Sequence, residues 1–579
     1  MLRRTTLGAV ALGGTLLALA APTRAQDNNR LDTAHRAYAT YELLRGGRPL
    51  SEELFRLGWP TSGEWQRLTH EMAADPGAWL VQSTLGSGAG LRLSASEYEW
   101  SRADRAKRGG ENVQGPAALL RRQIQAYRTI AGAPGSLVLP GGWDPTFIPV
   151  WRADAQLGST WHPDNVGTWT WRDSGQAVHT LEGLGFTLLS EVEYARQQLL
   201  HEREEDLGGR RAKYIGRNGR DGFFALVALH SALAKVAELR SLMFDLKNLT
   251  ITSTSEPLKL DELRYFCAHK WNSAVGANGR IVHTVVDGVD NQRSHLSGQA
   301  AVLMGLSNLA LLCDPSLKGP VSELWKERTI EGTKVPMFEK DTYLKVVELA
   351  VCVFRSMRTQ HVDVRAGRAV SVSGGRTITA ADLGLYLTAI EAFMEIVPPT
   401  GPAGGDKSPL YKDLQDEQRK GRTLLTTLAE QIRSWDDPQD PGLYDYYDVA
   451  SNEQGTRSRS LASQAFCVRG LMAVHRALSR QTPRSMYVLS AEKLMRYLEQ
   501  DRWVQQVGAY LEPKKGQNRS ASLQAAAALL GALREMAVQA GDGRALMRYR
   551  QCLEGMQERG LYRPAADRAP PTLASEITD

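Results

Sequence analysis

The stretch from His283 to His295 gathers several chemically active side chains in one short loop. Between its two histidines lie Asp287, Asp290 and Arg293. Carboxylates can act as general acids or bases, histidine exchanges a proton near neutral pH, and arginine binds anionic groups. Asp290 could equally cap the helix that follows, because short polar side chains favour that position. We take Asp290 as a candidate catalytic residue, with Arg293 and His295 as candidate substrate-binding residues.

A second loop, 435–457, mixes carboxylates with tyrosines. Asp448 is its candidate catalytic residue, and Tyr446, Tyr447 and Arg457 are candidate substrate-binding residues. We expect no cofactor, but calcium stays open as an alternative because this ion prefers several oxygen ligands. The D-x-D-x-D-G pattern of a common calcium loop is missing. The aspartates that could ligate calcium are Asp436, Asp437 and Asp440.

A third loop, 133–172, is rich in tryptophan. Exposed tryptophan faces stack on the apolar C–H faces of sugar rings. Trp161, Trp169 and Trp171 are therefore candidate substrate-binding residues, although a loop without a helix could also use them to pack against itself. Asp173 follows this loop at the predicted start of a helix and is the third candidate catalytic residue.

The remaining composition narrows the class of protein. The formal net charge is +6 for 579 residues, which gives no general reason to expect a nucleic-acid partner. The five cysteines show no C-x-x-C spacing, and the chain has no G-x-S-x-G, H-E-x-x-H or GKS/GKT motif. We therefore expect no zinc site, no serine-hydrolase elbow and no phosphate-binding P-loop.

The segments that follow these loops share a pattern rich in small residues. The stretch Ser297-Gly298-Gln299-Ala300 is echoed at Ser174-Gly175-Gln176-Ala177, Ser463-Gln464-Ala465 and Ser522-Leu523-Gln524-Ala525. Helices of this kind are predicted to begin near Asp173, Gly222, His295, Thr379, Ser460 and Ser520. More charged helices alternate with them, at 260–269, 341–358, 414–434, 485–499 and 543–556.

This alternation predicts two concentric rings of helices. Small residues suit inner helices that are crowded on every side, whereas charged residues suit outer helices with one wet face. Successive starts lie roughly 50–80 residues apart, too far for units of the TPR or HEAT type. Because the strand-like pieces are short and lie in connections, we predict an all-α fold with short β pieces in loops.

The alternation resembles the six-hairpin α/α toroid of many glycoside hydrolases and polysaccharide lyases, over about residues 116–560. A toroid like that of the terpenoid cyclases, or a plain helical solenoid, would give a similar pattern. The resemblance implies an (α/α)6 toroid whose substrate groove lies at the mouth, where the inner helices begin. The positive ends of those helices favour anions there.

The same resemblance implies a carbohydrate-active protein that binds a polysaccharide or oligosaccharide. We expect a glycoside hydrolase, which needs two carboxyl groups flanking one glycosidic bond. One alternative is a lyase that cleaves an acidic polymer with a His and Tyr pair, for which Asn291 and His361 are further candidates beside the residues named above. The other is a toroid that binds carbohydrate or acts as an envelope scaffold without catalysis.

The N-terminus predicts export. Arg3 and Arg4 precede an apolar stretch, 7–21, and Thr23-Arg24-Ala25 is an acceptable cleavage site. No later stretch approaches about 20 uninterrupted apolar residues, so we expect no transmembrane segment and a periplasmic or extracellular protein. The predicted organisation is a signal peptide at 1–25, an N-terminal helical extension at 26–115, the toroid at 116–560 and a disordered tail at 561–579.

Overall fold

The structure is a computed structural model that describes residues 33–59, 63–86, 126–133, 178–200, 214–243, 265–266, 268–275 and 281–285. From 293 to 578 it describes the chain with gaps at 319, 326–327, 331–332, 336–337, 339–340, 364–366, 400–408, 436–441, 452, 454–457, 480–484, 514–518, 560–561, 564–571 and 574–575.

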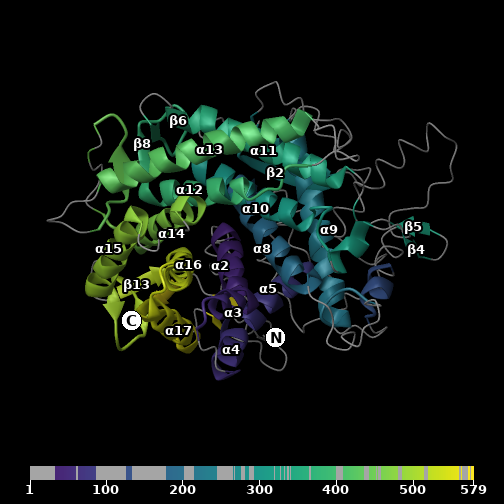
Figure 1. Cartoon of the computed structure of the whole chain (residues 1–579), viewed down its shortest axis with the longest axis horizontal. Helices are drawn as coiled ribbons and strands as arrows, with labels where there is room; N and C mark the ends of the chain where they lie inside the picture. Colours follow the sequence, from purple (N-terminus) through teal and green to yellow (C-terminus); the bar gives the residue numbers. More distant parts are fainter. Residues whose placement is uncertain are drawn as a thin grey trace, which may run out of the picture.

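Six helices form a closed inner ring, in which each helix packs against the next and the last returns to the first. In ring order they are α2 (Thr33–Arg45), α8 (Leu181–Leu199), α10 (Leu296–Leu312), α12 (Ala380–Met394), α14 (Leu461–Ser479) and α16 (Leu523–Gln539). Figure 1 shows α2 between α16 and α8, where it closes the ring.

A second helix packs on the outside of each inner helix. In the same order these are α5 (Asp75–Gly86), α9 (Gly219–Leu242), α11 (Thr342–His361), α13 (Pro409–Ser434), α15 (Met486–Asp501) and α17 (Gly543–Glu558). Shorter helices lie nearby, namely α3 (Arg48–Arg56), α4 (Gly63–Thr69), the π-helix η2 (His70–Ala74) and the 3-10 helix η8 (Pro320–Trp325). Six inner and six outer helices make an (α/α)6 toroid, so the predicted fold class is confirmed.

The membership of the inner ring differs from the prediction by one helix. The helix expected near Gly222 is α9, which lies outside α8, and its place in the ring belongs to α2. Residues 33–45 were expected in an extension packed on the toroid. The apolar pattern of α9 has a physical reason, because it is covered by α8, α5 and α11. By length and composition the segment Gly219–Arg240 could span a membrane, but 83% of its most apolar window is buried inside the protein.

Glycine lets the inner helices approach closely. A Cβ atom added to Gly185 of α8 would overlap the backbone of Val302 in α10, and one added to Gly384 of α12 would overlap the carbonyl oxygen of Phe466 in α14. Such overlap cannot be relieved by a side-chain rotation, because the neighbouring atoms are backbone. The small-residue pattern is therefore a packing requirement of the inner ring.

Buried ion pairs join inner helices at a distance from the starts of those helices. Arg469 of α14 pairs with Glu42 of α2 at 2.7 Å, although α16 lies between these helices in the ring. Arg476 of α14 also pairs with Glu391 of α12 at 2.8 Å. The four side chains are only 1–14% exposed. The Arg469–Glu42 pair therefore joins two inner helices that are not neighbours in the ring.

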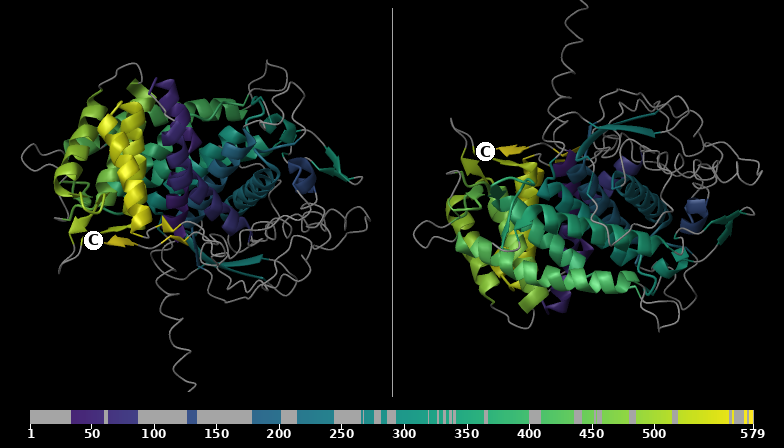
Figure 2. Two further views of the ribbon diagram at one scale, coloured as in Figure 1. Left: turned by 90° about the horizontal axis from the view of Figure 1, so that it is seen from below. Right: turned by 90° about the horizontal axis from the view of Figure 1, so that it is seen from above.

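Short antiparallel strands occupy the connections, as predicted. The main sheets are β1 (Val178–Thr180) with β2 (Lys270–Val275) and β3 (Ile281–Val285), and β12 (Glu512–Pro513) with β13 (Arg519–Ser522) and β16 (Glu576–Thr578). Figure 2 shows β2–β3 and β13–β16 at the same end of the helices. Two-stranded pairs complete the set: β4 (Arg328–Ile330) with β5 (Thr333–Val335), β6 (Val362–Asp363) with β7 (Arg368–Ala369), β8 (Thr377–Thr379) with β9 (Tyr446–Asp448), β10 (Trp503–Val504) with β11 (Ala509–Tyr510), and β14 (Tyr562–Arg563) with β15 (Thr572–Leu573).

The C-terminal residues differ from the expected disordered tail. Strand β16 pairs with β13, with Ala521 opposite Ile577, and so extends the sheet that leads into α16. Backbone hydrogen bonds to an edge strand order this segment, and they leave little signal in its composition. The predicted boundaries after residues 25, 115 and 560 lie outside the described residues and stay predictions.

Candidate active site at the mouth of the ring

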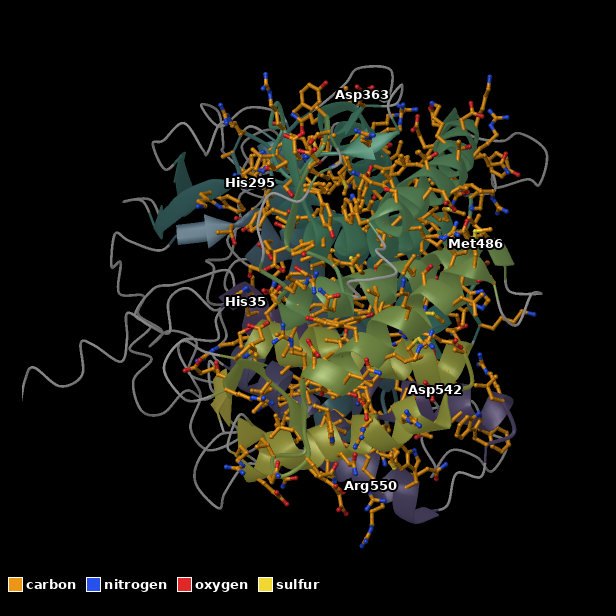
Figure 3. All side chains as sticks on the ribbon, turned by 90° about the vertical axis from the view of Figure 1, so that its left-hand side faces the viewer. His35, His295, Asp363, Met486, Asp542 and Arg550 are labelled. Atoms are coloured by element: carbon orange, nitrogen blue, oxygen red, sulfur yellow. The ribbon has the colours of Figure 1, made fainter. Side chains whose placement is uncertain are left out.

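The inner helices begin at one end of the ring, which we call the mouth. Strands β1, β8 and β13 each run directly into the first turn of an inner helix at this end. Figure 3 shows His35 of α2 and His295, which precedes α10, on the same side of the molecule. Met486 and Asp542, at the starts of outer helices, lie on the opposite side. The mouth therefore collects first-turn side chains from inner helices that are far apart in the sequence.

Most of these helix starts are capped in the ordinary way. Four begin with a hydroxyl residue whose side chain accepts a hydrogen bond from the amide three residues later, at 2.9–3.2 Å. These residues are Thr180, Thr379, Ser460 and Ser522. The corresponding residue of α10 is His295, whose side chain makes no capping bond. Replacing a hydroxyl cap typically costs about 1 kcal/mol, so α10 gives up this stabilisation and presents an imidazole at the mouth.

Glu182 is the second residue of α8 and is half-buried. Burial raises the pKa of its carboxyl group. The charge of His35 opposes this shift, the carboxylate of Asp382 adds to it, and a hydrogen bond from Ser297 opposes it. The Ser297 hydroxyl lies 3.5 Å from Glu182 Oε2. Side chains from α2, α10 and α12 therefore influence this carboxyl group of α8.

Asp382, the third residue of α12, is half-buried and also has a raised pKa because of burial. Hydrogen bonds from the hydroxyls of Ser371 and Thr379, and the charge of His295, act in the opposite direction. These partners all stabilise the ionised form. Asp382 therefore has more support as a carboxylate than Glu182, whose hydroxyl partner is at the limit of hydrogen-bonding distance.

Two further histidines surround His295. The rings of His269 and His295 meet edge to face, with centroids 6.2 Å apart. Burial, together with the neighbouring histidines, lowers the pKa of His269 to about 3. Burial also lowers the pKa of His361 to about 4. Both rings are neutral at physiological pH. Among the described residues, no group of three or more His, Cys, Asp or Glu side chains is arranged to hold a metal ion.

Several predicted site residues lie outside the described residues and stay predictions. They are Asp173, Asp290, Trp161, Trp169, Trp171, Arg457 and the three aspartates considered for calcium. Two others lie within the described part of the mouth. Arg293 is exposed just before α10, and His295 is half-buried between His269 and Asp382.

The structure gives Asp448 a local role. Its Oδ1 accepts hydrogen bonds from the backbone N–H groups of Ala450 and Ser451, both at 2.9 Å. These bonds, the one from Ser451 foremost, lower the pKa of its carboxyl group. A carboxylate that closes a turn in this way is held in its ionised form. Asp448 is therefore a turn residue with no described contact to Glu182 or Asp382.

The two neighbouring tyrosines differ from each other. Tyr446 is 45% exposed on β9 and remains available to a ligand. Tyr447 is buried and stacks on Trp435, with ring centroids 3.8 Å apart. The prediction that Tyr447 contacts a substrate is therefore wrong, because period-two alternation in a strand turns adjacent side chains to opposite faces.

Glu182 and Asp382 are not among the site residues predicted from the sequence. The only signal was their position, since each lies in the first turn of a small-residue helix after a threonine cap. Acidic residues are common there for electrostatic reasons alone, because they complement the helix dipole. What marks these two is that burial raises the pKa of both carboxyl groups and that the charge of Asp382 acts on Glu182. Two such carboxyl groups can provide one proton donor and one base in the same site.

No protein-family model matches the sequence, and a search of curated proteins finds no match either. Among solved structures, the chain is similar to a D-mannose isomerase, with a TM-score of 0.37 and 11% identity over 76% of this chain and 85% of that one. A sugar epimerase from a ruminal bacterium matches with a TM-score of 0.42 and 11% identity, over 80% of this chain and 90% of that one. A GH76 α-mannanase from Bacteroides thetaiotaomicron matches with a TM-score of 0.30 and 12% identity, over 59% of this chain and 80% of that one. These are distant likenesses in fold alone.

Proposed function

We propose that this protein is a carbohydrate-active enzyme, a glycoside hydrolase whose acid–base pair is Glu182 and Asp382. The observation that carries the proposal is their arrangement. Two half-buried carboxyl groups lie in the first turns of different inner helices at the mouth, each has a raised pKa, and the charge of Asp382 acts on Glu182. Hydrolysis of a glycosidic bond needs one protonated carboxylic acid and one carboxylate on opposite sides of that bond.

The surroundings assign a role to each group. Asp382 is the better supported of the two as a carboxylate, by two hydroxyl donors and by His295. Its charge raises the pKa of Glu182 further and so favours the protonated form of that group. Glu182 is thus the general acid that protonates the leaving-group oxygen. Asp382 is the base that activates water or the nucleophile that attacks the sugar.

The assignment to carbohydrate draws on the loop that precedes α8. Its predicted sugar-stacking residues, Trp161, Trp169 and Trp171, come shortly before Glu182 in the chain. Because a signal peptide is predicted, the proposal includes export of the enzyme. The N-terminal sequence of the secreted protein should then begin at Gln26.

The test is reducing-sugar release from a panel of polysaccharides. Glu182→Gln and Asp382→Asn should each lower kcat by about 10²- to 10⁴-fold while circular dichroism and thermal unfolding stay unchanged. Asp448→Asn is the matched control, because it alters a carboxylate of the same chain outside this pair, and it should keep full activity. Full activity in both Glu182→Gln and Asp382→Asn would refute the assignment.

A lyase is the second candidate, and His295 is the observation that favours it. Its imidazole replaces a helix cap at the mouth, and the exposed Arg293 lies two residues away. A histidine base beside a cation that neutralises a uronate carboxylate would suit β-elimination. That reaction yields an unsaturated product with ultraviolet absorbance and no water consumed. Such absorbance, lost in His295→Gln but kept in Glu182→Gln, would favour the lyase over the hydrolase.

A further inference from the structure

His361, the last residue of α11, is fully buried and uses both ring nitrogens. Nδ1 lies 3.0 Å from the carbonyl oxygen of Val370, and Nε2 lies 2.7 Å from Oγ of Ser294. A carbonyl oxygen can only accept, so Nδ1 carries the proton and donates to it. Nε2 therefore accepts the hydroxyl proton of Ser294. This pairing fixes the tautomer of His361.

The pairing resembles a serine nucleophile with its base, but its surroundings exclude that role. Ser294 is 1% exposed, so a substrate cannot reach its oxygen. That oxygen also accepts a hydrogen bond from Nε2 of Gln299, which in turn lies 3.0 Å from Oε1 of Gln360. A nucleophile needs a free lone pair that faces a substrate. The Ser294–His361 pair is therefore fully occupied within the protein.

The Ser294–His361 pair affects His295 because Ser294 is its neighbour in the chain. Ser294 immediately precedes His295, and its backbone N–H and C=O both bond to Ser373, at 3.0 Å each. On the other side of His295, the backbone N–H of Leu296 donates to the carbonyl oxygen of Ser371 at 2.8 Å. His295 is thereby held as a bridge residue opposite Val372. We call residues 294–296 and 371–373 together the clamp.

The clamp also reaches Asp382. Oγ of Ser371 accepts a hydrogen bond from the backbone N–H of Thr379 at 2.8 Å, and Thr379 caps the turn that carries Asp382. The Ser371 hydroxyl is also a hydrogen-bond partner of the Asp382 carboxylate. One set of hydrogen bonds therefore connects His361, His295 and Asp382. The groups that face His295 from the packed elements are His269, His361 and Asp382.

We propose that His361 is a positioning residue, which acts through Ser294 and the clamp to hold His295 beside the Asp382 carboxylate. The inference rests on the proposed function, in which Asp382 must be ionised. His361 touches no substrate in this scheme. Its contribution is geometric: the clamp keeps the imidazole of His295 at the distance where its charge supports Asp382 as a base.

Two substitutions of His361 separate its two hydrogen bonds. In His361→Asn the amide can still donate to Val370 but no longer reaches Ser294, whereas in His361→Gln the longer amide can still meet Ser294. His361→Asn should lower kcat about 10- to 100-fold with little change in KM, the size seen when supporting hydrogen bonds of a site are removed. His361→Gln should keep most of the kcat that His361→Asn loses. Ser294→Ala should match His361→Asn and is the milder change if the asparagine variant fails to fold.

A pH–rate profile distinguishes positioning from a merely structural role. When His295 moves away from Asp382, the carboxylate loses a stabilising charge, and the acidic limb of the profile should shift to higher pH in His361→Asn and in Ser294→Ala. An unchanged kcat and acidic limb in folded Ser294→Ala would overturn the positioning role. Glu182→Gln and Asp382→Asn are measured beside them. If those two keep full activity the hydrolase assignment fails, and if they are inactive the clamp variants decide the positioning role alone.

Discussion

Glu182 and Asp382 are electrostatically coupled across the mouth, although α10 lies between their helices in the inner ring. Burial raises the pKa of Glu182, and the carboxylate of Asp382 raises it further. Like charges held close together cannot both ionise freely. The ring therefore lets the charge of one carboxyl group act on another whose helix is not its neighbour in the ring.

This coupling predicts opposite shifts in two variants. Asp382→Asn removes a negative charge and should lower the pKa of Glu182, whereas Ser297→Ala removes a hydrogen bond to its ionised form and should raise it. Carbon-13 NMR of labelled glutamate reads the pKa in both proteins. In Ser297→Ala the alkaline limb of the pH–rate profile should also move to higher pH, because the general acid stays protonated longer. Shifts of the same sign in both variants would contradict the coupling.

The buried carboxyl group of Glu238 should make the folded protein less stable as pH rises. Burial raises the pKa of this carboxyl to about 7, opposed by its hydrogen bond from Trp271, whose Nε1 lies 3.0 Å from Glu238 Oε1. The unfolded carboxyl, with the ordinary value of 4.5, releases its proton first. Its stabilisation is therefore complete below about pH 4.5 and is lost as pH rises through about 7.

The variant Glu238→Gln should flatten this dependence. The amide cannot ionise, yet its carbonyl oxygen can still accept from Trp271 Nε1. At about 1.4 kcal/mol per pKa unit, the pH-dependent loss removed is about 3 kcal/mol. Thermal unfolding at pH 4.5, 6 and 8 measures it in both proteins. A pH dependence as steep in the variant as in the parent would assign the effect to other groups.

An ion pair is buried between α8 and α9. Removing one partner should strongly lower the free energy of unfolding. Lys235 Nζ lies 2.8 Å from Glu191 Oε2, and both side chains are less than 5% exposed. Lys235→Met leaves a buried carboxylate and should cost about 3–5 kcal/mol in the free energy of unfolding. The double variant Glu191→Leu with Lys235→Met should recover most of that loss. Denaturant unfolding measures each free energy.

The matched control for this pair is exposed. Arg48 Nε and Glu52 Oε1 lie 2.7 Å apart, with side chains 46% and 43% exposed. Arg48→Met should change the free energy of unfolding by less than about 1 kcal/mol, because water screens the pair. Equal losses in Arg48→Met and Lys235→Met would show that burial does not set the cost.

The close approach of α12 and α14 predicts that Gly384 tolerates no side chain. Gly384→Ala would drive a Cβ atom into the carbonyl oxygen of Phe466, and overpacking against backbone should cost about 3 kcal/mol. Gly421→Ala in α13 is the control, since its Cβ would find its nearest neighbour at an ordinary 3.4 Å. That change should be neutral or stabilise by up to about 1 kcal/mol, because alanine favours helix. Chemical denaturation of both variants tests the difference.

The architecture is predictable from the pattern of residues along the chain. Alternation of small-residue and charged helices follows from burial, because a helix surrounded on all sides needs small residues and an outer helix needs a wet face. The hydroxyl caps at Thr379 and Ser460 likewise placed the starts of inner helices at one end. These are local properties, so the chain carries them in each segment separately. The residue His295 was also found this way, through its position before a small-residue helix.

Which helices close the ring, and which side chains act on each other, depends on contacts between distant segments. The composition of α9 reports that it is buried but not by which neighbours, so α2 became the sixth inner helix only through its contacts with α8 and α16. The same holds for Glu182 with Asp382 and for Ser294 with His361. Each of these pairs joins segments far apart in the chain, and ring closure, a property of no single segment, brings them together.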